Sequence, residues 1–147
     1  MKPAPVLYGL VWTTFLQILI ILLPLPSSNI ILGVHIALGL AVAALAGTTY
    51  RLVRSTGCPK RIRRIAKSTS ILASIQVLLG IGEGSTIAFK SSPALQNAVL
   101  AIHLVFALAI LAHTASQATS FDMWEEREIG APAVSSSPVK VGTATPS

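Results

Sequence analysis

The amino-acid sequence predicts an all-α membrane protein, a four-transmembrane-helix bundle built from two similar helix pairs. Of the 147 residues, 52% are apolar and only 11% are charged. The mean hydropathy of +0.72 is typical of integral membrane proteins rather than of soluble domains. The apolar residues gather in four runs, each near the roughly 20 residues that cross a bilayer. In addition, the second half of the chain repeats features of the first.

The spans are expected at about 6–23, 30–50, 69–89 and 93–116. Pro24 and Pro26 close the first run, and Pro24 to Asn29 is expected to be a tight turn in which Asn29 caps the second span. Ser92 and Pro93 are suited to cap and begin the fourth. The third span is expected to loosen near its glycine-rich end.

Residues 1–118 are therefore expected to form one membrane domain. The tail, residues 119–147, is rich in Pro, Ser, Thr and Ala after a short charged stretch. Such a composition cannot bury a core, so the sequence predicts a disordered tail.

The basic residues predict the orientation in the membrane. The net charge is +6, which could indicate a nucleic-acid partner, but most of the excess lies between the second and third spans. That stretch has no acidic residue, and its cations are Arg51, Arg54, Lys60, Arg61, Arg63, Arg64 and Lys67. By the positive-inside rule it faces the cytoplasm, as do both termini, so we expect a multi-pass protein of the cell (plasma) membrane and no nucleic-acid partner.

The two helix pairs align on polar residues. His35 in the second span matches His103 in the fourth, and Gln17 in the first matches Gln76 in the third. Since the second and fourth spans run in the same direction, the sequence predicts that the imidazoles lie at similar depth in the outer half, facing each other across the bundle axis.

The residue one turn after each histidine is small, Gly39 on one helix and Ala107 on the other. Residues four apart share a helix face, so a slot beside each ring could admit a flat ligand. Two imidazoles from facing helices in an apolar cavity suit haem iron. Zinc wants three or four ligands, and non-haem iron wants a carboxylate beside two histidines, so both fit less well.

Other polar residues leave alternatives open. Each histidine could simply bond a neighbouring helix, although the cost of placing ionisable groups in lipid favours a functional role. Gln17 and Gln76 could bridge helices or donate to a porphyrin carboxylate. Glu83 could carry protons or be a solvated loop acid. His113 and the single Cys58, which can form no intrachain disulfide, are given no role in the site.

The chain resembles one known family. Gln76-Val-Leu-Leu-Gly80 followed by Leu95 to Ala109, with His103 in an Ala/Leu-rich helix, is similar to the second helix pair of a haem A synthase half. His35 onward to Arg51 resembles the other histidine-bearing helix of that family. The resemblance covers about residues 14–115, so the chain would be a compact, half-length variant.

The resemblance implies a function. His35 and His103 would be the axial ligands of haem b, with haem O as a substrate whose methyl group is oxidised to a formyl group. Membrane lipid would surround the site, and haem O synthase or terminal oxidase assembly would be the partners. Where the family's catalytic half usually has Glu, this chain has Leu32, so Glu83 is the candidate catalytic acid.

One histidine pair cannot hold a cofactor haem and a substrate haem together, which favours a homo-oligomer for the synthase. Two other functions stay open from the residues. The chain could be a non-enzymatic membrane cytochrome b for quinone-linked electron transfer. It could instead be a small membrane scaffold or assembly factor without haem, in which both histidines are structural.

Overall fold

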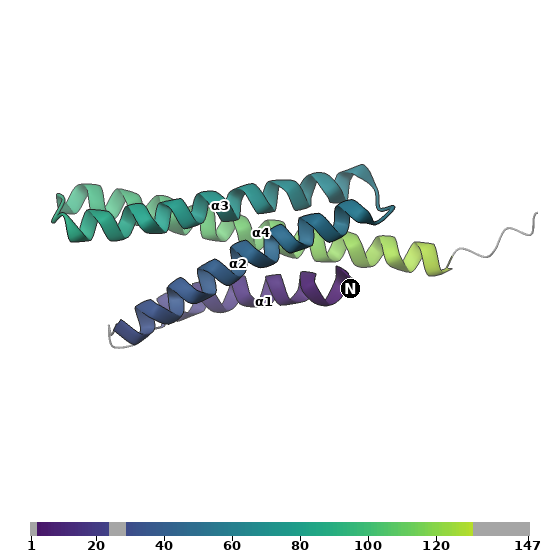
Figure 1. The fold of residues 1–147 in the computed structure, drawn as a ribbon, viewed down its shortest axis with the longest axis horizontal. Helices are drawn as coiled ribbons and strands as arrows, with labels where there is room; N and C mark the ends of the chain where they lie inside the picture. Colours follow the sequence, from purple (N-terminus) through teal and green to yellow (C-terminus); the bar gives the residue numbers. More distant parts are fainter. Residues whose placement is uncertain (1–2, 24–28, 131–147) are drawn as a thin grey trace, which may run out of the picture.

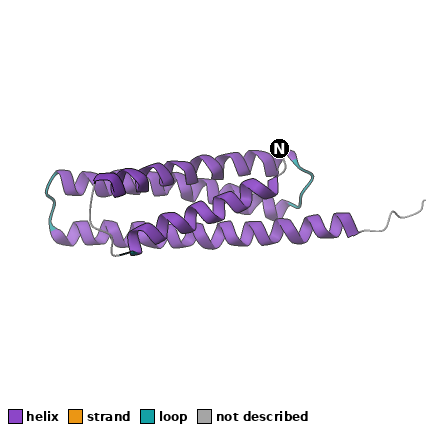
Figure 2. Ribbon diagram, turned by 90° about the horizontal axis from the view of Figure 1, so that it is seen from below, coloured by secondary structure: helices purple, strands orange, loops and turns teal. Residues whose placement is uncertain are grey.

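A computed structural model describes residues 3–23 and 29–130, and all regular structure in these residues is helical (Figures 1 and 2). The helices are α1 (Pro3–Leu22), α2 (Asn29–Ser55), α3 (Lys60–Ala88) and α4 (Pro93–Gly130). Each is long and apolar enough to cross a membrane. The predicted all-α four-helix bundle is confirmed, and the chain is a multi-pass membrane protein.

The helices form a closed ring around one axis. Within the described residues, each helix packs on the next one along the chain, and α1 also packs on α4. No backbone contact joins α1 to α3 or α2 to α4. The helices α2 and α4 are therefore diagonal to each other, so only their side chains can meet on the axis.

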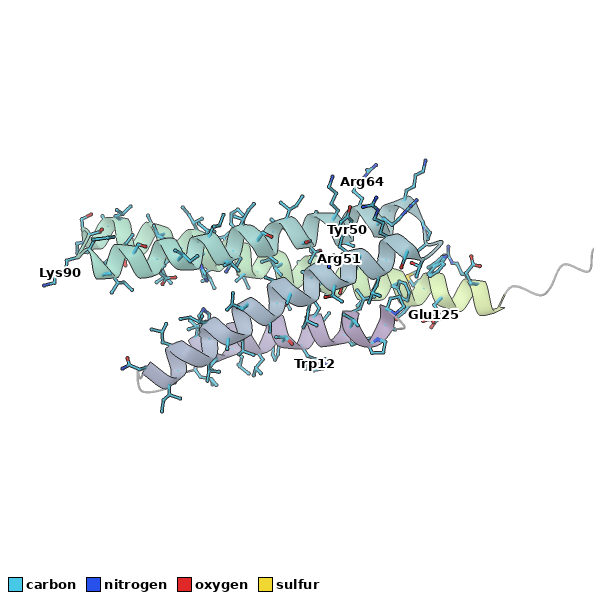
Figure 3. The ribbon with its side chains drawn as sticks, in the orientation of Figure 1. Trp12, Tyr50, Arg51, Arg64, Lys90 and Glu125 are labelled. Atoms are coloured by element: carbon cyan, nitrogen blue, oxygen red, sulfur yellow. The ribbon has the colours of Figure 1, made fainter. Side chains whose placement is uncertain are left out.

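Basic residues mark one end of the bundle, which we call the basic end. Arg51 of α2 and Arg64 of α3 lie there, while Lys90 lies at the opposite end (Figure 3). The first residues of α1 and the last turns of α4 are also at the basic end, and α4 extends past the other helices (Figure 1). Glu125 lies toward this end of α4 (Figure 3).

The core follows the sequence repeat. The offset that aligns His35 with His103 also relates every buried residue of α2 to a buried residue of α4. The matched pairs are Val42 with Ile110, Ala46 with Thr114, Thr49 with Gln117, and Val53 with Phe121. The offset that aligns Gln17 with Gln76 likewise relates Leu7, Leu10 and Thr14 to Ala66, Thr69 and Ala73. The two helix pairs therefore bury the same faces.

Two apolar clusters form this core. The basic-end cluster consists of Leu7, Val53, Cys58, Ile62, Ala66, Ala118 and Phe121. The middle cluster consists of Leu10, Val42, Ala46, Ala73 and Ile110. Beyond the middle cluster, burial stops at Ile18 on α1 and at Gln76 on α3. In that half the α1–α2 pair diverges from the α3–α4 pair (Figure 1).

Large apolar side chains cover the outside of the bundle. Trp12 is 65% exposed and Leu78 is 67% exposed. In water such a surface would promote aggregation, whereas in lipid it is the ordinary outer face of a transmembrane helix. The exposed apolar surface therefore agrees with the membrane location that hydropathy predicts.

The fourth helix is longer than the sequence predicted. It was expected to end at Ser116 and to give way to a disordered tail from residue 119, but it continues to Gly130. The reason is that Phe121, only 2% exposed, packs in the basic-end cluster and stacks edge-to-face on Trp124, with ring centroids 5.3 Å apart. Apolar residues three apart continue the buried face of the helix past the membrane span.

The third helix also departs from the prediction. It begins at Lys60 rather than near residue 69, because Pro59 precedes the first turn and the basic residues that follow are good helix formers. Its glycine-rich end does not loosen, since the helix runs unbroken to Ala88. As predicted, the hydroxyl of Ser92 caps α4, accepting a bond from the amide of Leu95 at 3.4 Å. The predicted turn at 24–28 and the rest of the tail, 131–147, lie outside the described residues.

Candidate functional site

The structure brings His35 and His103 together on the bundle axis. They come from the diagonal helices α2 and α4, and their ring centroids are 6.3 Å apart with a 47° angle between the planes. Because no backbone contact joins these helices, the two rings span the interior between them. The sequence predicted this placement from the repeat and from the common direction of the two spans.

Both rings carry buried nitrogens without a hydrogen-bond partner. These are Nδ1 of His35 and both Nδ1 and Nε2 of His103, whose side chain is 12% exposed. A buried polar atom that lacks a partner costs free energy, more so in a low-dielectric environment. An imidazole nitrogen in this condition is suited to accept a proton or to bind a metal.

Helix α3 supplies the surroundings of His103. The side-chain amide of Gln76 donates to the backbone carbonyl of His103 at 3.0 Å. A Cβ atom at Gly80 would lie 3.3 Å from Cε1 of His103, so the glycine makes room for the ring. Further along the same helix, Oε2 of Glu83 is 3.9 Å from Nδ1 of His103. That distance is an ion-pair separation rather than a hydrogen bond.

Glu83 is therefore not a loop acid. It lies within α3, and its side chain is 28% exposed. Of the two alternatives that the sequence left open, the loop position is wrong, and a role in carrying protons stays a prediction.

The glutamines contact the histidine-bearing helices of their own pairs. Gln76 bridges α3 to α4, which is the helix-bridging role considered for it. In the other pair, Nε2 of Gln17 lies 2.9 Å from where a Cβ atom of Gly39 would be. The slot expected at Gly39 is thus filled by a side chain of α1. Ala107, expected to leave the corresponding slot on α4, is partly buried.

His113 and Cys58 lie apart from this site. Nδ1 of His113 is 2.9 Å from the carbonyl oxygen of Ala109, one turn earlier on α4. The buried thiol of Cys58 donates to the carbonyl of Val53 at 3.2 Å, within the basic-end cluster. Neither residue is placed to join the histidine pair.

Gly80 is the one site residue whose role sequence reasoning missed. It stands one turn after Gln76, and residues four apart share a helix face. Since Gln76 aligns with Gln17 and was expected at a helix interface, the same face could have placed Gly80 beside α4. The sequence could not show that His103 was the residue it accommodates.

The chain matches no protein-family model, no curated protein and no solved structure. Within residues 3–23 and 29–130, no group of three or more His, Cys, Asp and Glu side chains is placed to hold a metal ion. The site thus consists of two imidazoles, one carboxylate and the glutamines and small residues that position them.

Proposed function

We propose that this protein is a membrane haem protein in which His35 and His103 are the axial ligands, and that it acts as a compact haem A synthase. The observation that supports the haem site is the meeting of two imidazoles from diagonal helices, with ring centroids 6.3 Å apart, each with at least one buried nitrogen that makes no hydrogen bond. The synthase activity is inferred from the resemblance of the motifs around these histidines.

The spacing of the rings fits haem iron. With their ring centroids 6.3 Å apart, His35 and His103 would each hold the iron through one ring nitrogen. Ligation would also give one buried nitrogen of each ring a partner. A haem bound there would supply the iron-centred redox chemistry of the reaction.

The residues of α3 would hold His103 in place for this role. Gln76 fixes the backbone of the α4 turn that carries the ring, and Gly80 leaves space for the ring edge. Glu83 stands on the Nδ1 side, so Nε2 is left for the metal. A carboxylate beside the ring nitrogen that does not bind the metal orients a ligating imidazole and raises its basicity. Glu83 is also the candidate proton-transferring acid for oxidation of haem O.

The cell context completes the proposal. The positive-inside rule would put the basic end, and with it both termini, on the cytoplasmic side of the plasma membrane. The histidines would then lie in the outer half. A second copy of the chain would hold the substrate haem, and haem O synthase or the terminal oxidase assembly would be the neighbouring partners.

A second candidate function is electron transfer by a cytochrome b. It is favoured by the presence of one histidine pair on the axis of the described bundle, which is enough for a single electron-carrying haem. A scaffold without haem, the remaining alternative, would leave the ring nitrogens without partners.

The absorption spectrum of the purified protein tests the haem site. We expect a low-spin haem spectrum in the wild type, and loss of that spectrum in both His35→Ala and His103→Ala. The matched control is His113→Ala, because His113 lies on the same helix as His103 and bonds its own backbone. Wild-type protein without haem, or an unchanged low-spin spectrum in either site variant, would refute the axial pair.

A second experiment separates the enzyme from the electron carrier. The protein is co-expressed with a haem O producer, and the extracted haems are analysed by mass. Hydroxylated or formylated haem, absent from cells with the His103→Ala variant, is expected of a synthase. If haem O accumulates unchanged while the protein still carries haem, the synthase activity is excluded and the cytochrome alternative remains.

A further inference from the structure

A second set of unpartnered polar side chains is buried inside the bundle, away from the histidines. Thr49 of α2 is 1% exposed and Gln117 of α4 is fully buried. The hydroxyl of Thr49 and both polar atoms of the Gln117 amide have no hydrogen-bond partner. In a membrane protein no bulk water can reach such groups, and each costs free energy while it lacks a partner.

Thr49 differs from the other buried threonines among the residues described. The hydroxyls of Thr14, Thr69 and Thr114 each donate to a backbone carbonyl three or four residues earlier, which is the usual way to satisfy a threonine inside a helix. The hydroxyl of Thr49 does not. It is therefore available to a partner outside its own helix.

The two residues are equivalent in the repeat. The offset that aligns His35 with His103 aligns Thr49 with Gln117, and both follow their histidine by about four turns, roughly 21 Å. Val42 and Ala46 on α2 and Ile110 on α4, one to two turns before them, belong to the middle cluster, and Val53 and Phe121, one turn later, belong to the basic-end cluster. The polar pair is thus enclosed between two apolar layers.

From this arrangement we propose that Thr49 and Gln117 form a binding site for ordered water that links α2 to α4 across the axis. The amide provides two N–H donors and an oxygen with two acceptor lone pairs, and the hydroxyl provides one donor and two acceptor lone pairs. A cation would leave the donors unsatisfied and an anion the acceptors, whereas water satisfies both and typically makes about three hydrogen bonds when buried. The site is independent of the proposed haem site.

The water would join α2 to α4, which share no backbone contact. α2 belongs to the first helix pair and α4 to the second. A polar contact enclosed in an apolar core fixes the register of the helices that share it, because a slip leaves both partners unsatisfied. The same register sets the height at which His35 and His103 meet.

A crystal structure of the full-length protein in a lipid phase, at a resolution that shows ordered water, tests the proposal. The expected result is density within hydrogen-bond distance of both the Thr49 hydroxyl and the Gln117 amide. The proposal is overturned if the two side chains bond each other directly, or if Thr49 bonds the carbonyl of Leu45 and no density lies between them.

Unfolding equilibria measured in detergent provide a test in solution. Thr49→Val and Gln117→Leu are made singly and together, with Thr114→Val as the control, since the hydroxyl of Thr114 is already satisfied by its own helix. Each variant lowers the folding equilibrium constant by some factor. The factor for the double variant is expected to be about threefold smaller than the product of the two single factors, as is typical of polar contacts between membrane helices. Thr49→Val combined with Thr114→Val is expected to show no such coupling. Simple multiplication of the effects of Thr49→Val and Gln117→Leu would refute the link.

Discussion

Replacing Gly80 by alanine tests how closely α3 is fitted to His103. The Cβ atom of Gly80→Ala would lie 3.3 Å from Cε1 of the ring and 3.9 Å from Nδ1. Carbon atoms pack best at about 3.5–4.0 Å, so the ring has to move by a few tenths of an ångström. Gly82→Ala is the matched control, because Gly82 is in the same helix and a Cβ atom there has nothing within 4 Å.

Alanine is more favourable than glycine inside a helix by roughly 0.5–1 kcal/mol. We therefore expect Gly82→Ala to raise the free energy of unfolding by about that amount and to leave haem content unchanged. At Gly80 the displacement of the His103 ring opposes the same gain, so we expect little or no rise in stability and a lower haem content.

Two measurements on the same samples check these expectations. Circular dichroism followed through a denaturing-detergent titration reports stability, and the ratio of haem to protein absorbance reports binding. If Gly80→Ala and Gly82→Ala behave alike in both measurements, the contact between Gly80 and the ring does not constrain the site, and the packing argument is wrong.

Three further predictions concern the core and the surroundings of the site. Phe121→Ala should lower the free energy of unfolding by about 3–5 kcal/mol because the ring is buried, whereas Met123→Ala, 51% exposed, should change it by less than about 0.5 kcal/mol, both measured by detergent unfolding. Gln76→Leu removes the bond to the His103 carbonyl and should cost about 0.6 kcal/mol in the same assay, with a broadened haem band; an unchanged spectrum and stability would show that the bond is dispensable. Glu83→Gln removes a negative charge 3.9 Å from His103 and should raise the haem midpoint potential by roughly tens of millivolts in a redox titration, while a fall in potential would contradict the electrostatic role of Glu83.

The four helices were predictable because lipid leaves the backbone few choices. Each apolar run must satisfy its own N–H and C=O groups, and a helix does so within one segment. The placement of the histidines was predictable for a related reason: two spans that run in the same direction and align residue by residue carry matched residues to the same depth. The ends of the helices were less predictable. Phe121 extends α4 through a contact with the basic-end cluster that no local pattern of residues shows.

The neighbours of each side chain were decided by the tertiary structure. In water a helix reveals its buried face by its pattern of apolar residues, but in lipid the outer face is as apolar as the core. The sequence therefore did not indicate that Gly39 meets Gln17, that Gly80 meets His103, or that Thr49 is buried without a partner. Those contacts depend on how each helix is rotated and on which helices stand diagonally. The sequence by itself determined the spans, the repeat and the common height of the two histidines along the bundle, and the packing of the four helices decided what surrounds them.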